Sequence, residues 1–221
     1  MSKKAIIAFP GVGNIGMIVA DYMINNLPVK KIGRIKSDEF PAILLDSEEN
    51  FRLPSINMYS VKNSDVIIFA GDAQPPTEKG VYKLSDELIT KMKKLKIKQV
   101  ISLGGIGTET EPKNPRVYVI SNRSKNYRKF IKLGVEKANG NVNAIFGMTG
   151  IVFGKLSEHG IDTSILLAET GGQIEGGING ASKIIKVLSS YLKIKMDMNV
   201  KIQKRRHENT IKETDKIHYI G

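Results

Sequence analysis

Cysteine and tryptophan are absent from this 221-residue sequence, and aromatic residues make up only 6% of it. Without cysteine the chain can form no disulfide bond, no thiolate zinc site and no cysteine nucleophile. No apolar run approaches the roughly 20 residues that a membrane-spanning helix needs. The N-terminal residues lead directly into a short apolar segment, without the pattern of a signal peptide. We therefore expect a cytoplasmic protein that does not enter a membrane.

Several motifs of catalysis and metal binding are also missing. No glycine-rich loop ends in Lys-Ser or Lys-Thr, as a P-loop requires, and no G-x-S-x-G nucleophile elbow occurs. The three histidines, His159, His207 and His218, are far apart and lack the spacing of metal ligands. The sequence therefore predicts no metal site and no catalytic residue.

The chain has few acidic residues for its number of basic ones: 34 Lys and Arg stand against 22 Asp and Glu, giving a formal charge of +12. Such a charge can attract an acidic partner or bind nucleic acid through phosphate contacts. The lysines are dispersed and aromatic side chains for base stacking are scarce, which favours a solvated lysine-rich surface. We expect no specific nucleic-acid site.

Short apolar runs of strand length alternate with amphipathic segments of helical periodicity, a pattern typical of a doubly wound α/β sandwich. The sequence predicts three layers, with a mostly parallel sheet in a single α/β domain over residues 1–192. Residues 193–221 are predicted to be a basic C-terminal helix or flexible tail. The expected strands cover residues 5–9, 29–35, 56–61, 65–71, 99–103, 117–121 and 163–168.

Two segments near the N-terminal end of the chain predict an antiparallel addition to this sheet. Residues 42–45 and 56–61 are apolar or alternating, and the acidic turn Asp46 to Asn50 separates them, so we expect them to form a hairpin. The segment Val29 to Ile35 carries several cations between its apolar residues, which indicates an edge strand.

The segment Phe9 to Gly16 has the spacing G-x-G-x-x-G between a predicted strand and a predicted helix. One interpretation is a nucleotide- or dinucleotide-binding enzyme in which Gly11, Gly13 and Gly16 hold a pyrophosphate and Asp38 or Glu39 binds ribose hydroxyls. The other is packing: Gly11 and Gly13 shape the turn, and Gly16 lets the helix press against the sheet. We favour packing, with no cofactor.

Four glycine-rich segments, starting at Gly11, Gly71, Gly104 and Glu169, are predicted to be loops at the carboxyl ends of strands. In open α/β folds ligands bind at this edge. Asp72 and Glu169 could form a carboxylate pair there. The alternative, which we favour, is that they cap helices and accept hydrogen bonds from nearby loop N–H groups.

Five glycine-containing segments, taken in order, resemble the proteasome assembly chaperone family, and the resemblance covers about residues 4 to 192. The five segments are Pro10–Gly16, Gly71–Pro75, Gly104–Thr108, Thr149–Val152 and Glu169–Gly171. The resemblance implies an archaeal homologue of the second eukaryotic proteasome assembly chaperone, with a fold like that of nucleoside phosphorylases. It further implies a homo-oligomer, from trimer to pentamer, that acts on proteasome α subunits without catalysis.

The resemblance also implies that the C-terminal segment anchors the protein to proteasome α subunits. Here Lys204-Arg205-Arg206 is a basic cluster, and the apolar residues Ile217, Tyr219 and Ile220 follow a polar stretch. These three residues are the expected partner contacts, since an apolar tip that its own chain does not bury can be buried on a partner. Alternatively, the tip folds back on its own body or on a sister subunit. Tyr219 stands one place too early to match the hydrophobic-Tyr-any ending of proteasome activators.

Overall fold

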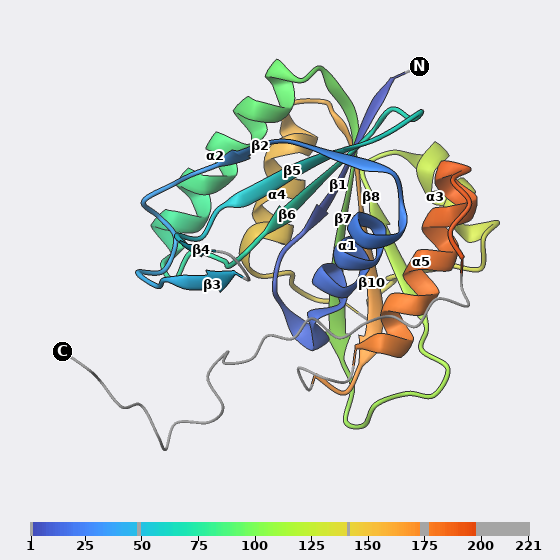
Figure 1. Cartoon of the computed structure of the whole chain (residues 1–221). Coiled ribbons are helices and arrows are strands. Elements are labelled where there is room, and N and C mark those ends of the chain that lie inside the picture. Colours follow the sequence, from blue (N-terminus) through green and yellow to red (C-terminus); the bar gives the residue numbers. More distant parts are fainter. Residues whose placement is uncertain (1, 48–49, 141, 173–176, 198–221) are drawn as a thin grey trace.

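A single eight-stranded sheet, covered by helices on both faces, forms the body of the protein (Figure 1). The computed structural model describes residues 2–47, 50–140, 142–172 and 177–197. A separate two-stranded hairpin adjoins the sheet. The elements are β1 (Lys3–Ala8), the 3-10 turn η1 (Val12–Asn14), α1 (Ile15–Asn26), β2 (Val29–Ile35), β3 (Leu45–Ser47), β4 (Asn50–Arg52), β5 (Ile56–Val61), β6 (Val66–Gly71), α2 (Glu78–Lys94), β7 (Ile97–Gly107), β8 (Val117–Ser121), α3 (Ser124–Ile131), β9 (Glu136–Lys137), α4 (Gly147–Glu158), β10 (Asp162–Thr170) and α5 (Ile178–Leu192).

The strand order is β2-β5-β6-β1-β7-β10-β8-β9. The central strands β6, β1, β7 and β10 are parallel, whereas β5 runs antiparallel to β2 and β6, and β8 runs antiparallel to β10. Every residue of β6 is buried, because helices cover both faces of the central strands. The predicted three-layer sandwich with a mostly parallel sheet is confirmed.

Two hydrophobic cores lie on opposite faces of the sheet. Alternation along β1 sends Ile6 into the core under α1, α3 and α5, while Ile7 enters the core under α2 and α4. The parallel register pairs Ile6 with Ile68 and Ile7 with Phe69, so each core continues across neighbouring strands. Thr77 caps α2, where its hydroxyl accepts a hydrogen bond from the Gly80 N–H at 3.1 Å.

The expected hairpin between residues 42–45 and 56–61 is wrong. Strand β5 lies between β2 and β6, with which it forms its two antiparallel ladders. Both edges of β5 are therefore paired, and all of its residues are buried or half-buried. The short hairpin is instead β3 with β4, in which Leu45 pairs with Arg52 and Asp46 with Phe51. The edge position predicted for β2 is confirmed.

Three of the predicted glycine-rich loops begin within strands. Gly71 ends β6, and Glu169 lies inside β10. Strand β7 continues through Gly104 to Gly107, where it pairs with the end of β10. A residue with a side chain would not fit here, because a Cβ at Gly105 would lie 2.2 Å from the backbone oxygen of Val12. The prediction of a loop at Gly104 is therefore wrong, although the segment does reach the carboxyl edge.

The chain remains on the body for several residues after α5. Lys193 ends the helix in the left-handed conformation, Met196 is buried in the core beside α1, and the Tyr22 hydroxyl donates a hydrogen bond to the Asp197 carbonyl oxygen. Ile217, Tyr219 and Ile220 lie outside the described residues. Across the described part of the chain, no helix is both long and apolar enough to span a bilayer.

Candidate functional site

The glycine-rich turn between β1 and α1 is held by close backbone contacts. Gly13 has a φ of 61°, and a Cβ at this residue would lie 2.5 Å from Thr170 Oγ1. A Cβ at Gly16 would lie 2.9 Å from the Leu103 carbonyl oxygen, and one at Gly177 would lie 1.9 Å from the Gly13 carbonyl oxygen. The turn is thus clamped between β7 and the start of α5, as the packing interpretation requires.

Gly11 differs from the other two glycines of the motif. The closest atom that a Cβ at Gly11 would meet is Gln74 Nε2, at 4.0 Å. Its φ of −174° and ψ of −161° are extended backbone, so no left-handed conformation demands glycine here. Gly11 instead contributes backbone to the wall of a pocket.

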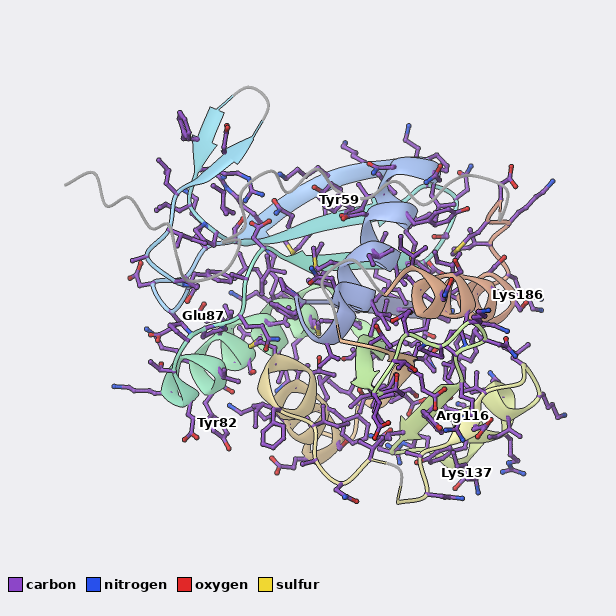
Figure 2. The ribbon with its side chains drawn as sticks, turned by 90° about the horizontal axis from the view of Figure 1, so that it is seen from below. Tyr59, Tyr82, Glu87, Arg116, Lys137 and Lys186 are labelled. Atoms are coloured by element: carbon purple, nitrogen blue, oxygen red, sulfur yellow. The ribbon has the colours of Figure 1, made fainter. Side chains whose placement is uncertain are left out.

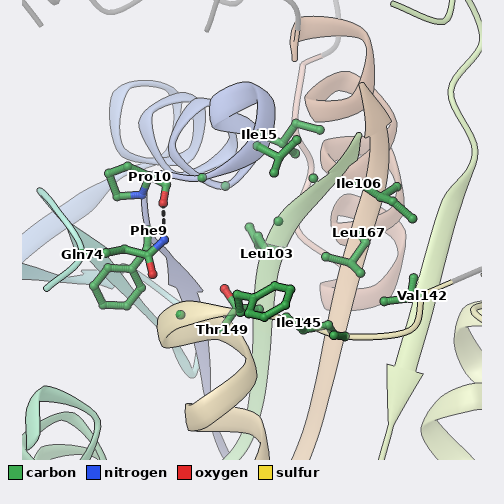
Figure 3. Close-up of a pocket in the computed structure, with 18 of the residues that line it drawn as sticks. Phe9, Pro10, Ile15, Gln74, Leu103, Ile106, Val142, Ile145, Thr149 and Leu167 are labelled. Atoms are coloured by element: carbon green, nitrogen blue, oxygen red, sulfur yellow. Dashed lines mark hydrogen bonds between the residues drawn. The ribbon is translucent and has the colours of Figure 1, made fainter. Parts of the chain in front are cut away.

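This pocket has a volume of about 590 Å³ and lies between the glycine-rich turn, β7 and the segment that leads into α4 (Figure 3). The connection from β1 leads toward β6, whereas the chain after β7 continues on the other side to β8 and β10. The pocket therefore lies at the topological switch point, where open α/β sheets usually bind ligands. Its lining consists of Phe9, Pro10, Gly11, Val12, Ile15, Gly16, Gln74, Leu103, Gly104, Gly105, Ile106, Val142, Asn143, Ala144, Ile145, Phe146, Gly147, Thr149 and Leu167.

Gln74 connects two walls of the pocket. Its Nε2 donates a hydrogen bond to the Pro10 carbonyl oxygen at 2.6 Å (Figure 3), and its Oε1 accepts one from the Met148 N–H at 2.9 Å. The amide thus satisfies one of the free N–H groups in the first turn of α4. Gly147 makes this contact possible, since a Cβ there would lie 2.2 Å from Gln74 Oε1.

The pocket is chemically suited to apolar groups. None of the described residues that line it carries a charge, and its polar side chains are Gln74, Asn143 and Thr149. At the rim, Phe146 is 87% exposed and Val12 is 45% exposed. The lining offers amide and hydroxyl groups for hydrogen bonding, but it provides no cation for a phosphate and no carboxylate for a ribose.

The structure places Asp38 and Glu39 away from the glycine-rich turn. Both follow β2, an edge strand that β5 and β6 separate from β1, and neither lines the pocket. Glu39 accepts a hydrogen bond from Lys83 Nζ on α2 at 2.7 Å. In a dinucleotide-binding fold the acidic residue would lie beside the glycine-rich turn. Gly11 and Gly16 therefore line the pocket, whereas Asp38 does not.

Asp72 and Glu169 do not form the carboxylate pair that was considered. Asp72 directly follows β6 and Glu169 lies in β10, and β1 and β7 lie between these two strands, which are about 14 Å apart at the usual strand spacing of about 4.8 Å. Asp72 forms an ion pair with Arg52 and accepts hydrogen bonds from the Ser55 N–H at 2.9 Å and hydroxyl at 3.2 Å. These hydrogen bonds agree with the alternative interpretation, in which Asp72 accepts hydrogen bonds from neighbouring groups and takes no part in catalysis.

Glu169 is held by a second, separate group of donors. Its carboxylate accepts hydrogen bonds from Arg116 Nε at 2.7 Å, the Arg116 N–H at 2.9 Å and the Tyr118 hydroxyl at 3.0 Å. Burial alone would raise the pKa of Glu169, but the hydrogen bonds from Arg116 and Tyr118 prevail and hold this pKa below its ordinary value. Burial, followed by the hydrogen bond to Glu169, raises the pKa of Tyr118. Glu169 is therefore a charged acceptor at neutral pH.

Sequence reasoning missed the residues that close the pocket on the side of α4. Residues 142–146 have neither helical nor alternating periodicity, and Gln74 and Thr149, although they lie in segments that carry the family resemblance, were not predicted to line a pocket. His159 caps the C-terminal end of α4, while His207 and His218 lie outside the described residues. In the described ranges, no group of three His, Asp or Glu side chains could hold a metal ion.

Comparisons with known proteins agree with the fold. PbaB of Pyrococcus furiosus, an archaeal proteasome activator, superposes with a TM-score of 0.81 at 23% identity over 89% of this chain and 86% of its own. PbaA of the same organism, an archaeal homolog of proteasome-assembly chaperone, gives a TM-score of 0.78 at 26% identity over 90% of this chain and 80% of its own.

A relative is also found by sequence. An uncharacterized protein of Methanocaldococcus jannaschii is 29% identical over 216 residues, which cover 95% of this chain and 80% of the relative. The model of the PAC2 family matches residues 5–212. This match includes the glycine-rich turn, the pocket and all of the described body except residues 2–4, so the chain belongs to the PAC2 family.

Proposed function

We propose that this protein is a non-enzymatic proteasome assembly chaperone-like protein that binds proteasome α subunits. Membership of the PAC2 family carries the proposal, because the match spans residues 5–212. The similarity to PbaA, at 26% identity over 90% of this chain, supports it. We also propose a cytoplasmic homo-oligomer of three to five copies.

The chemistry of the described residues supports a binding role over catalysis. The two carboxylates at the carboxyl edge, Asp72 and Glu169, are each saturated by neighbouring donors and lie in different hydrogen-bond groups. The pocket between them is mostly apolar. A binding protein needs shaped apolar surface of this kind, whereas general acid-base catalysis needs a proton donor or acceptor that reaches the substrate.

The proposed contact with α subunits is the C-terminal apolar tip. Ile217, Tyr219 and Ile220 follow a stretch dominated by charged and polar residues, and each would gain about 1.5–3 kcal/mol on full burial. Met196 is buried in the core beside α1 and the Asp197 carbonyl oxygen accepts a hydrogen bond from Tyr22, so the described chain is held on the body up to residue 197.

A pull-down with purified proteasome α subunits tests the proposal. Deletion of residues 207–221, or replacement of Ile217, Tyr219 and Ile220 by serine, should weaken binding at least about tenfold, since tenfold corresponds to only about 1.4 kcal/mol. The matched control replaces Lys212 and Lys216 by serine and should retain binding. Unchanged binding after the deletion would overturn the role of the tip. Failure of the full chain to bind any α subunit would overturn the function itself.

A further inference from the structure

Helix α3 and the turn that follows it expose basic and apolar side chains together. Phe130 faces the core, whereas Arg128 and Lys132, at the helical spacing of four residues, lie exposed on the outer side. Two apolar side chains lie beside them: Ile131 is 41% exposed and Leu133 is 36% exposed. We use the term α3 face for the exposed side chains of residues 128, 129, 131, 132 and 133.

The C-terminal end of α3 fixes the position of this face. Gly134 has a φ of 81°, and its N–H donates a hydrogen bond to the Ile131 carbonyl oxygen at 3.0 Å. The Val135 N–H donates to the Phe130 carbonyl oxygen at 3.2 Å, so the helix ends in a Schellman motif. Because Phe130 and Val135 both enter the core, residues 131–133 are held at the surface between them.

Neighbouring elements extend the positive charge on both sides of α3. Lys137 Nζ on β9 lies over the Tyr127 ring, 5.7 Å from its centre, and Lys129 Nζ lies over the Tyr191 ring of α5, 6.0 Å from its centre. Phe130 stacks on Tyr191 with 4.3 Å between the ring centres, so α3 and α5 lie side by side (Figure 1). The basic surface therefore runs from β9 across α3 to α5.

Helices α3 and α5 carry no carboxylate that could neutralise these cations. Neither helix contains Asp or Glu, and α5 adds the exposed lysines Lys183 and Lys186. Helix α2, on the other face of the sheet, has three carboxylates among its lysines. Figure 2 shows Lys137 and Lys186 at one side of the molecule and Glu87 of α2 at the other. The unneutralised positive charge is thus concentrated on the side of α3 and α5.

Glu136 is next to Lys137 in the sequence but does not belong to this surface. The register of β8 and β9 pairs Glu136 with Tyr118 and pairs Lys137 with Val119. Val119 enters the core under α3, and successive side chains of a strand point to opposite faces. Lys137 therefore lies on the side of α3, and Glu136 points to the opposite face of the sheet.

Asp162 neutralises cations at the start of α3. Its carboxylate meets Arg123 Nε at 3.0 Å and Lys125 Nζ at 3.7 Å. Farther along the helix, the cations of the α3 face form no ion pair with a carboxylate of the described chain. Their charge is therefore available to an acidic partner.

The apolar side chains of the face favour a protein over a nucleic acid as this partner. Cations alone suit the negative end of a helix dipole or the phosphates of a nucleic acid. Ile131 and Leu133 serve neither role, but they can pack against the apolar side chains of a protein. The rings of Tyr127 and Tyr191 lie beneath lysines, so they are not presented for base stacking.

We propose that the α3 face binds an acidic protein segment that carries apolar side chains. Carboxylates of the segment pair with Arg128, Lys129 and Lys132, and its apolar side chains pack on Ile131 and Leu133. This contact goes beyond the α-subunit binding proposed above, because it uses the body of the protein and none of residues 207–221.

Fluorescence anisotropy on the full chain tests the role of the cations. The probe is a labelled peptide of glutamates with two leucines at its centre. Replacement of Arg128, Lys129 and Lys132 by glutamine should weaken its binding about tenfold, because an exposed ion pair contributes about twofold to threefold.

Two control variants remove the same charge elsewhere and should each change the affinity less than about twofold, since salt screens distant charges. They replace by glutamine, respectively, Lys91, Lys93 and Lys94 of α2 and the tail cluster Lys204, Arg205 and Arg206. Weakening by either control as large as that caused by the α3 variant would overturn the proposal, because binding would then follow net charge or the tail.

The apolar side chains are tested with a second pair of variants. Ile131→Ser/Leu133→Ser should weaken binding of the leucine-containing peptide about tenfold and leave that of an all-glutamate peptide unchanged. The matched control Ile32→Ser changes a side chain that is 39% exposed on β2, and it should have no effect. Equal binding of the two peptides, or tighter binding of duplex DNA than of either, would overturn the protein partner.

Two further measurements make these results specific. Circular dichroism checks that each variant is folded, and the charge variant remains a test if the apolar variant does not fold. Light scattering without peptide should give the same mass for wild type and both α3 variants. A lower mass of the variants would show that another copy of this chain occupies the α3 face, and would overturn the proposal. No α subunit takes part in these experiments, so their outcome is independent of the proposed function.

Discussion

Replacement of Glu169 by glutamine tests how far a single buried carboxylate stabilises the carboxyl edge of the sheet. Glu169 is 7% exposed and accepts three hydrogen bonds, two of them from Arg116 and one from Tyr118. Glutamine has nearly the same shape but only one acceptor oxygen, and its NH₂ group faces a donor. Hydrogen bonds to charged groups contribute about 1.5–3 kcal/mol.

The expected loss is smaller than the sum of these bonds. The Arg116 side chain is 57% exposed, so solvent screens its ion pair with Glu169. The remaining glutamine oxygen still accepts one or two of the donors. We therefore expect Glu169→Gln to lower the free energy of unfolding by about 1–2 kcal/mol, which corresponds to about 2–8 °C in melting temperature for a domain of this size.

The pH dependence gives a second, independent signature. The pKa of Glu169 is lower in the folded chain than its ordinary value, so the folded state binds fewer protons than the unfolded state. The stabilising contribution is thus fully present above the ordinary carboxyl pKa of about 4.3 and is lost as pH falls through the folded value. The difference in stability between wild type and variant should therefore shrink between about pH 5 and more acidic solution.

Urea unfolding followed by circular dichroism, at pH 7 and along a series to pH 3, measures both effects. The control is Asp86→Asn: the Asp86 side chain is 67% exposed, and its carboxylate meets Lys155 Nζ at 2.6 Å. This exposed pair should contribute less than about 0.5 kcal/mol. The reasoning fails if Glu169→Gln costs no more than Asp86→Asn at pH 7, or if its cost is the same at every pH.

Three further predictions concern the glycines and the ligands considered from the sequence. Gly105→Ala should lower the free energy of unfolding by about 2 kcal/mol, because its Cβ would lie 2.2 Å from the Val12 oxygen. Gly154→Ala, in open space on α4, should raise the free energy of unfolding by about 0.5 kcal/mol. Equal free energies for the two variants in urea titrations would contradict the close contact at Gly105. Calorimetry with NAD, NADP and ATP should show no saturable heat, since the described pocket lining has no charged side chain. Saturable binding that Ala144→Trp removes would instead support the interpretation as a nucleotide- or dinucleotide-binding enzyme. Any affinity for duplex DNA, measured by fluorescence anisotropy, should be independent of sequence and fall steeply between 50 and 200 mM salt; a salt-resistant, sequence-dependent signal would contradict the assignment of the lysines to a solvated surface.

The central strands could be predicted because their local pattern and their final environment agree. The run at β6 is apolar throughout and is buried on both faces, and β1 and β10 follow the same logic. The partner of β5 could not be predicted in this way. Its alternation indicates a strand but does not say with which strands it pairs. The pairing of β5 with β2 joins segments that are distant in the sequence.

The candidate site was predictable at one wall only. The spacing of Gly11, Gly13 and Gly16 located the turn at the carboxyl edge, but the same spacing fits a pyrophosphate cradle and a packing contact equally well. What distinguishes them is tertiary: Leu103 lies against Gly16, and Thr170 lies against Gly13. The wall formed by residues 142–146 has no periodicity of its own, so its position depends on Gln74 and α4 rather than on local preference.

The hydrogen bond between Tyr22 and the Asp197 carbonyl defines a tether point for the terminal segment. A polypeptide of the length of residues 198–221 spans at most about 86 Å when fully extended. Every partner that the C-terminal tip contacts must therefore lie within that radius of the middle of α1. In the proposed homo-oligomer, several C-terminal tips would be present in one assembly. Together they would bind a multisubunit partner with an avidity set by geometry, so that a modest affinity at each tip is sufficient.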